Sequence, residues 1–243
     1  MAKLLYVDIV SAIESEIANG KLTEGSKLSS ERELALQFNV SRNVVREAIK
    51  VLREKGFVDI QVGRGVFVKK PEPKLVSESL ERVLDTSITG MEEILEVREV
   101  LELAIIKRVV HQATDEDISE LKKIFEEMES KKFHVNEFVE LDAKFHLQLA
   151  TATKNNVFNI LSTSFSELSN KSIKLTIYNP MSVNIAQKQH WQLIKAIEKR
   201  DEALGEKVMR AHMDDVRKDI KILKKHMEEQ QQEERKNSIN FDR

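Results

Sequence analysis

Apolar residues recur every three or four positions over residues 3–19, the spacing that places side chains on one face of an α-helix. Gly20 is positioned to end this helix. Ser30 and Glu33 then have the spacing of a capping box, in which the two residues satisfy backbone N–H groups at the start of a second helix. Ser41 is placed to cap a third helix, which stops at a glycine. The front of the chain is therefore predicted to form three consecutive helices.

A different pattern follows in the stretch FVDIQVGRGVFVKK, residues 57–70. β-Branched residues alternate with other types on both sides of the turn sequence Gly63–Gly65, which predicts a β-hairpin. In the next stretch, KKPEPK, two prolines flank a glutamate, and this composition favours an extended backbone. We therefore expect a first domain over residues 1–70 and a linker over residues 71–74.

The remainder of the chain has helical spacing and no competing alternation. Seven helices are predicted, near residues 75–87, 91–112, 115–131, 137–153, 156–178, 182–199 and 202–234. Thr114, Asn136 and Asp201 are placed to cap three of them. Residues 235–243 are polar, and we expect a disordered tail there. The predicted fold is mostly α, with three helices and a β-hairpin followed by an all-helical bundle of about seven helices over residues 75–234.

Composition narrows the class of protein. Of the 243 residues, 33% are charged and 41% are hydrophobic, which is within the range of helix-rich globular proteins. The absence of cysteine excludes disulfides, thiolate metal ligands and a cysteine nucleophile. Acidic residues interrupt the apolar start of the chain, so we predict neither a signal peptide nor a membrane span, and we expect a cytoplasmic protein. Residues 1–70 carry 12 Lys+Arg against 9 Asp+Glu, whereas the rest is acidic, which suggests two domains with different partners.

The third predicted helix has one apolar and one polar, cationic face. Val45, Ala48, Ile49 and Leu52 share the apolar face, and Arg42, Asn43, Arg46 and Lys50 share the other. Three helices followed by a hairpin are the plan of a winged helix-turn-helix, whose third helix enters the major groove of DNA. Arginine suits this role because its planar guanidinium bonds both O6 and N7 of a guanine. Each cation alone also has an interpretation as an ordinary solvated surface residue, but the whole arrangement favours DNA binding.

Residues 20–68, GKLTEGSKLSSERELALQFNVSRNVVREAIKVLREKGFVDIQVGRGVFV, resemble the DNA-binding domain of the GntR superfamily. The shared motifs are the G-x-L-x-x-G turn, L-x-S-E-R-E-L-A, V-S-R-x-x-V-R-E-A and the G-x-G-x-F-V wing. Glu24 and Ser29 stand where the family often has proline, but neither is a DNA-reading position. The resemblance implies DNA contacts by Arg32, Ser41, Arg42, Asn43, Arg46, Arg64 and Gly65.

Histidines mark the second domain. Asp142 and His146 are four residues apart and share one face of a predicted helix, while His190 and His212 lie on two other predicted helices. Neutral imidazoles with one carboxylate suit a divalent transition ion such as zinc, nickel or manganese. A single histidine on an amphipathic helix is more often an ordinary core or surface residue. Spacing alone therefore does not bring the four residues together.

The helical domain also resembles the FCD domain of the FadR subgroup of GntR regulators. The similar pieces are EVREVLE and DAKFHLQLATATKN, followed by the final pair of histidines. The resemblance implies that Asp142, His146, His190 and His212 bind a divalent metal ion, and that a small organic acid lies against it as effector. The remaining histidines, His111, His134 and His226, match nothing in the family and are interpreted as surface residues.

Two further residues of these pieces each have two interpretations. Arg98 lies near the edge of an apolar stripe formed by Leu95, Val100, Leu101, Ala104 and Ile105. Its guanidinium either pairs with Glu102, four residues later, or binds the carboxylate of the effector. Asn155 is either a helix cap, which we favour, or a hydrogen-bonding partner of the effector.

These observations predict a transcriptional regulator that binds a pseudo-palindromic operator as a homodimer and is not an enzyme. The family resemblance implies that it is a repressor. The alternative is a metal-dependent hydrolase or oxygenase of small organic acids fused to a DNA-binding head, because a metal site with an open position can activate water. No acidic residue is marked by spacing as a general base, which disfavours this alternative. A third hypothesis is a purely structural metal site.

Overall fold

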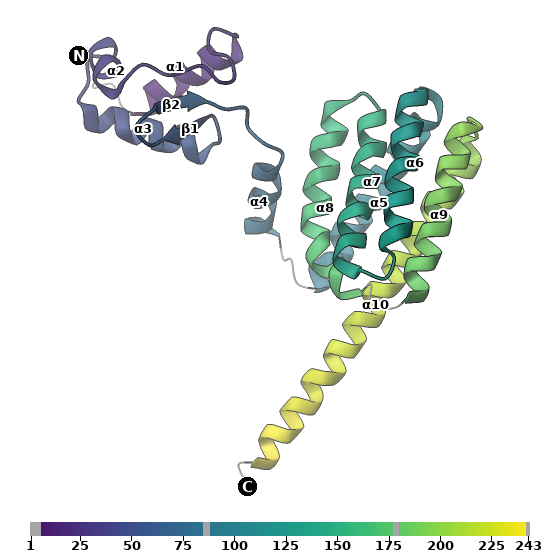
Figure 1. Ribbon diagram of the computed structural model, residues 1–243. Coiled ribbons are helices and arrows are strands. Elements are labelled where there is room, and N and C mark those ends of the chain that lie inside the picture. The colour runs from purple at the N-terminus through teal and green to yellow at the C-terminus, as the bar shows by residue number, and fades with distance from the viewer. Residues whose placement is uncertain (1–5, 85–87, 177–179, 242–243) are drawn as a thin grey trace. The chain divides into compact units, whose positions relative to one another are not determined.

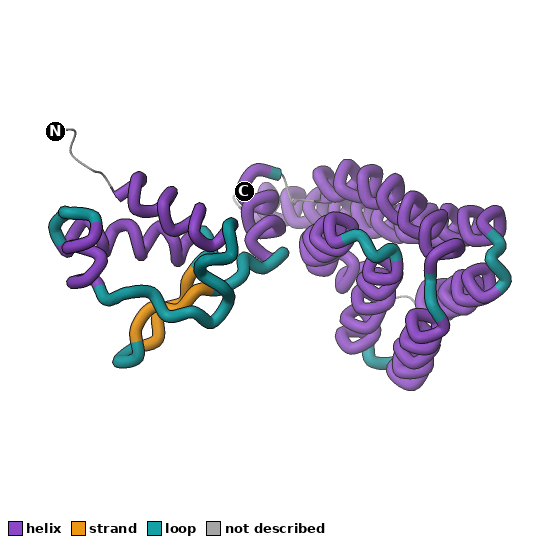
Figure 2. Tube along the Cα trace, turned by 90° about the horizontal axis from the view of Figure 1, so that it is seen from above, coloured by secondary structure: helices purple, strands orange, loops and turns teal. Residues whose placement is uncertain are grey.

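The computed structural model describes residues 6–84, 88–176 and 180–241 of the chain. It divides into two compact units, residues 1–75 and 76–243 (Figure 1). The first unit consists of α1 (Tyr6–Ala18), α2 (Glu31–Gln37), α3 (Arg42–Glu54), β1 (Val58–Gln61) and β2 (Gly65–Val68). The two strands are antiparallel, with Val58 opposite Val68, and Figure 2 shows this hairpin beside the three helices. The predicted winged helix-turn-helix fold is confirmed.

The core of the first unit lies between α1 and α3. The predicted apolar face of α3 is buried there, against Ile9 and Ile13 of α1 and Leu34 of α2. The capping box of Ser30 and Glu33 is confirmed. Ser41 occupies the cap position of α3, but its side chain makes no cap hydrogen bond, so the predicted capping role was wrong. The start of α3 therefore keeps backbone N–H groups that its cap residue does not satisfy.

The second unit is all helical. Its elements are α4 (Lys74–Val83), α5 (Ile88–Gln112), α6 (Asp115–Lys131), α7 (Val135–Ala152), α8 (Asn156–Thr176), α9 (Pro180–Glu198) and α10 (Glu202–Phe241), with α4 beginning two residues before the unit boundary. Helices α5 to α10 enclose one apolar core, with fully buried residues such as Ile106, Leu121, Phe145 and Ile194. Within the described ranges, no helix is long and apolar enough to cross a membrane.

Two predicted caps of this unit are confirmed and one was wrong. Thr114 forms a capping box at α6, and Asp201 accepts a hydrogen bond of 2.9 Å from a backbone N–H in the first turn of α10. Asn136 lies inside α7, whose cap position is held by His134. The chain enters α7 early because the His134 N–H bonds the carbonyl of Lys131 in a tight turn.

Two other features differ from the sequence prediction. The α10 helix continues to Phe241, where a disordered tail was predicted over residues 235–243. The turns that lead into this segment, residues 226–236, lack glycine and proline and are rich in the good helix formers Glu, Gln, Lys and Arg. On α5, Val100 and Ala104 were assigned to one apolar stripe with Leu95 and Ile105, but both are exposed, whereas Leu95 and Ile105 are buried. Helix ends predicted at residues 85–87 and 177–178 lie outside the described residues.

Candidate metal centre and DNA-reading surface

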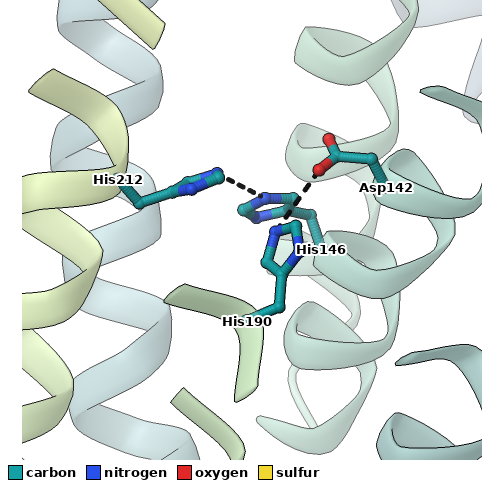
Figure 3. Close-up of side chains that lie close together, drawn as sticks. All are labelled: Asp142, His146, His190 and His212. Carbon is teal, nitrogen blue, oxygen red and sulfur yellow. Dashed lines mark hydrogen bonds and ion pairs between the residues drawn. The ribbon is translucent and has the colours of Figure 1, made fainter. Parts of the chain in front are cut away.

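Four side chains from three helices meet inside the second unit (Figure 3). Asp142 and His146 lie one turn apart on α7, His190 lies on α9 and His212 on α10. One ligand atom from each residue lies within 4.8 Å of the others, and all four residues are buried. The structure thus brings together the set that the resemblance implied and that spacing alone left apart.

The apolar core holds these polar residues in place. Phe138, Phe145 and Leu149 anchor α7 on both sides of the Asp142–His146 turn. Leu193 follows His190 on α9, and Met209 and Met213 flank His212 on α10. Each ligand therefore projects from a helix whose position is fixed by close packing.

The ring nitrogens have opposite environments. The Nε2 atoms of His146 and His212 lie 3.3 Å apart, and Nε2 of His190 lies 3.3 Å from Oδ1 of Asp142 (Figure 3). The Nδ1 atom of His212 lies 2.9 Å from Gln189 Oε1, and that of His190 lies 3.4 Å from Gln187 Oε1. The Nε2 atoms face inward, and the two Nδ1 atoms face side-chain carbonyls, the orientation expected of metal-binding histidines.

The third histidine lies beside a carboxylate. Nδ1 of His146 lies 3.0 Å from Oε1 of Glu102, although the two atoms are not aligned for a hydrogen bond. Glu102 in turn pairs with Arg98, whose Nε lies 3.5 Å away. Burial acts to raise the pKa of Glu102, but nearby His146 and Arg98 outweigh it and hold that pKa below its ordinary value. The carboxylate is thus charged beside the ring.

Burial also decides the charge of the other two rings. It lowers the pKa of His190 and of His212 well below 6.5, and the neighbouring cationic groups act in the same direction. Both imidazoles are therefore neutral near pH 7, which is the form that binds metal. Within the described residues, Nε2 of His190 is buried without a hydrogen-bond partner. Three imidazoles and one carboxylate with such inward-facing atoms fit a divalent transition ion.

A cavity of about 220 Å³ adjoins the cluster. Its lining includes Asp142, His212 and Arg98, and also the polar residues Ser182 and Asp219. Apolar lining comes from Phe138, Val183, Ile185, Ala186, Val216 and Ile222. A molecule in this cavity would touch two of the four cluster residues and the buried guanidinium.

Arg98 and Asn155, which each had two interpretations, lie in different environments. Arg98 is only 4% exposed and lines the cavity while also pairing with Glu102, so the two predicted contacts do not exclude each other. Asn155 is exposed, accepts a 3.0 Å hydrogen bond from the Val157 N–H at the start of α8, and is absent from the cavity lining. This geometry is that of a cap.

The other histidines lie away from the cluster. His111 is exposed and lies 2.7 Å from Glu202, and His134 is exposed at the start of α7. The side chain of His226 lies outside the described residues.

In the first unit, the predicted DNA-reading side chains are exposed. Ser41, Arg42, Asn43, Arg46, Arg32 and Arg64 are all exposed. Arg64 lies at the hairpin turn with its guanidinium 5.7 Å from the ring centre of Phe67, and Gly65 has a φ of 118°, which favours glycine. This surface suits contacts with phosphates and base edges.

The sequence interpretation missed three residues. Gln187 and Gln189 face two of the histidine rings, and their short spacing from His190 gave no recognisable motif. Glu31 accepts hydrogen bonds from Arg46 and Arg42. Glu31 lies on α2 and the two arginines lie on α3, so the periodicity of a single helix does not predict this contact, and only the folded structure reveals it.

A winged helix-turn-helix followed by an all-helical domain is an arrangement typical of DNA-binding regulators. The comparison with known protein families gives the same class. Residues 5–68 match the bacterial regulatory proteins of the gntR family, and residues 93–215 match the FCD domain. The chain belongs to the GntR family of bacterial transcription regulators and carries an FCD domain.

Relatives support this assignment. The HTH-type transcriptional regulator LutR of Bacillus subtilis is 30% identical over 205 residues, covering 82% of this chain and 94% of LutR. The Exu regulon transcriptional regulator of Escherichia coli K12 is 27% identical over 218 residues, covering 88% of this chain and 83% of the relative. The solved structure of Streptococcus agalactiae GntR shares the fold with a TM-score of 0.71, 24% identity and coverage of 88% of this chain and 99% of that one. These family matches and relatives are regulators, not enzymes, so the fused-enzyme alternative is rejected.

Proposed function

We propose that this regulator is a repressor whose operator affinity is controlled by a small carboxylate metabolite bound next to a divalent metal ion. The observation that supports this proposal is the cavity that touches Asp142, His212 and Arg98 together. An effector in that cavity would contact the metal site and a buried cation at once. It changes DNA affinity only if it binds one arrangement of the two DNA-binding heads better than the other.

Asp142, His146, His190 and His212 would hold the ion, which we expect to be zinc, nickel or manganese. When bound, the ion would supply a positive charge and an open coordination position for an oxygen ligand. The chain's own contribution is to keep His190 and His212 neutral through burial. It also places Gln187, Gln189 and Glu102 beside the three rings.

Arg98 would bind the effector's carboxylate. Its guanidinium is buried, lines the cavity and faces Glu102 through Nε, which leaves the terminal amino groups for a second acid. A planar guanidinium is well suited to bidentate contact with a carboxylate. Because Arg98 is buried, water would screen its attraction to the effector's carboxylate only weakly, and this would strengthen binding of a small acid.

The rest of the cavity lining indicates what else the effector carries. Ser182 donates a 3.1 Å hydrogen bond to Asp219, and both residues line the cavity. On α10, seven residues separate His212 from Asp219, a rise of about 10 Å. A short acid with hydroxyl groups away from its carboxylate would satisfy both regions of the lining.

The proposed dimer would form through the helical domain. On α5, Val97 and Val100 are 52% and 68% exposed, and Ala104 is also exposed. The spacing of three and then four residues aligns them as an outward apolar stripe, in the pattern by which helices pair. Two copies joined by a two-fold axis would present two heads to the two halves of a pseudo-palindromic operator.

The proposal is tested with the full-length protein after loading with zinc, nickel or manganese. The DNA probe is the duplex that the protein itself selects from a random-sequence library. We expect a panel of small hydroxy and keto acids to contain a compound that raises the melting temperature only of metal-loaded protein and weakens binding to this duplex. A protein that binds none of the three metals would contradict the proposal, and metal binding without any acid-dependent change in DNA affinity would favour a structural site instead.

A further inference from the structure

We propose that Glu31 is a positioning residue for base recognition, which orients Arg46 and restrains Arg42 before DNA is bound. Glu31 is the first residue of α2, and the two arginines lie on the exposed face of α3. The inference concerns DNA reading by the first unit and is independent of the metal site.

The contact involves one particular edge of the Arg46 guanidinium. Nε of Arg46 donates to both carboxylate oxygens of Glu31, at 2.9 and 3.1 Å. A terminal amino group of Arg42 reaches the same carboxylate at 3.5 Å. One acidic side chain on α2 therefore holds both arginines of the neighbouring helix.

This arrangement leaves the reading end of Arg46 free. The two terminal amino groups make no protein hydrogen bond within the described ranges, and together they match the O6 and N7 acceptors of a guanine. A long, flexible side chain loses conformational freedom when it binds a base. Because Glu31 already restrains the guanidinium, part of that cost is met before the protein meets DNA.

A contribution to folding does not account for the contact. The side chains of Arg42, Arg46 and Glu31 are 60%, 56% and 31% exposed, and ion pairs this open to solvent contribute little to stability. Glu33, which also lies in the first turn of α2, is used by the capping box instead. The function of Glu31 therefore lies at the surface that faces DNA.

The negative charge has a second consequence. A carboxylate beside the two arginines repels phosphate oxygens, so it disfavours complexes in which these arginines contact only the DNA backbone. Complexes in which Arg46 points to a base edge are disfavoured less. Glu31 would thus lower non-specific affinity while supporting specific binding, and specificity is the ratio of the two.

The test compares Glu31→Gln with wild type on two duplexes of equal length: the sequence that wild type selects from a random library, and a scrambled version of it. We expect the ratio of the two affinities to fall on the order of tenfold, the effect of ordering one long side chain on binding instead of beforehand. Binding to the scrambled duplex should become tighter, with a slope of log affinity against log salt steeper by about one, because a freed arginine reaches a phosphate.

The matched control is Glu54→Gln, which removes the same charge at the other end of α3, about 18 Å along the helix from Arg42. It should change both affinities by a similar factor and leave their ratio unchanged. Thermal unfolding of both variants should match wild type, because Glu54 is exposed and the ion pairs of the partly exposed Glu31 contribute little to stability. In the Arg46→Ala background, Glu31→Gln should no longer lower the ratio, because its main partner is missing.

Two outcomes would overturn the proposal. If Glu31→Gln tightens binding to both duplexes equally, the residue acts only as a surface charge. If it tightens binding to the selected duplex alone, Glu31 blocks the arginines instead of orienting them.

Discussion

The Nε2 atoms of His146 and His212 lie 3.3 Å apart, although the residues are 66 positions apart in the chain and belong to α7 and α10. Two imidazoles gain little by presenting ring nitrogens to each other unless a cation or a shared proton lies between them. The Nδ1 atom of His212 bonds Gln189, and that of His146 lies beside Glu102. These partners explain why the rings turn their Nε2 atoms toward the centre of the cluster.

Loss of a proposed ligand should remove the metal. We expect His190→Ala and His212→Ala to weaken metal binding by more than about 100-fold, and Asp142→Ala to weaken it less. Gln189→Leu should weaken it by about 10–100-fold, because the His212 ring loses the acceptor that orients it. Metal content after dialysis measures each effect, with exposed His111→Ala as the control that should retain wild-type content.

The metal-free protein should lose stability in mild acid. Since burial lowers the folded pKa of His190 and His212, the unfolded chain binds protons near pH 6.5 that the folded chain does not. Unfolding is therefore favoured as pH falls below 6.5, by about 1 kcal/mol for each histidine between pH 6.5 and 5.5. Urea unfolding in a chelator at these two pH values measures the change, and equal stability at both would show that the rings are not held neutral.

Arg98 is best tested with a variant that keeps its charge. Arg98→Ala would leave Glu102 buried without its cation, and such a loss costs about 3–5 kcal/mol of stability. Arg98→Lys keeps a cation near Glu102 but lacks the planar fork. We expect Arg98→Lys to retain metal and fold while its DNA binding no longer responds to the acid that acts on wild type. An unchanged response would restrict Arg98 to pairing with Glu102.

The fold was largely predictable because its helices carry strong local signals. The capping boxes at Ser30 and Thr114 and the turn between the two strands each specify structure within a few residues. The α5 helix was harder, since it is apolar on two sides: Ile105 faces the core, whereas Val100 faces outward. Periodicity alone does not tell which apolar side of a helix will be covered.

The sites were predictable in part. The spacing of Asp142 and His146 indicated a shared helix face, but their meeting with His190 and His212 depends on helix packing, and only the family resemblance anticipated it. Neither residue spacing nor family resemblance predicts a contact such as that of Gln189 with His212, because glutamines on helices are common and mostly solvated. Tertiary packing determines which glutamines face the histidine rings.

The arginines of α3 should determine operator binding. Arg42→Ala and Arg46→Ala are each expected to weaken binding to the selected duplex by about 1–3 kcal/mol and to relax base preference. Arg53→Ala serves as the control, because Arg53 is exposed in the last turn of the same helix. Gel-shift titration measures the three affinities, and wild-type binding by both test variants would reject α3 as the reading helix.

The exposed stripe on α5 should control oligomeric state. We expect the double variant Val97→Lys and Val100→Lys to be monomeric at micromolar concentration, because four lysines would face one another across the proposed two-fold axis. Val157→Lys is the control: Val157 is 60% exposed on α8, outside the stripe, and its replacement should leave the oligomer intact. Sedimentation of the full-length proteins measures the state directly.

DNA binding should follow oligomeric state. A monomer contacts one half of the operator, whereas the second head of a dimer binds as a tethered partner at high effective concentration. The double variant should therefore bind the selected duplex at least about 100-fold more weakly than wild type, while both bind an isolated half-site equally. A dimeric double variant would place the interface elsewhere on the helical domain. A monomeric variant with wild-type operator affinity would instead contradict recognition of the operator by a preformed dimer.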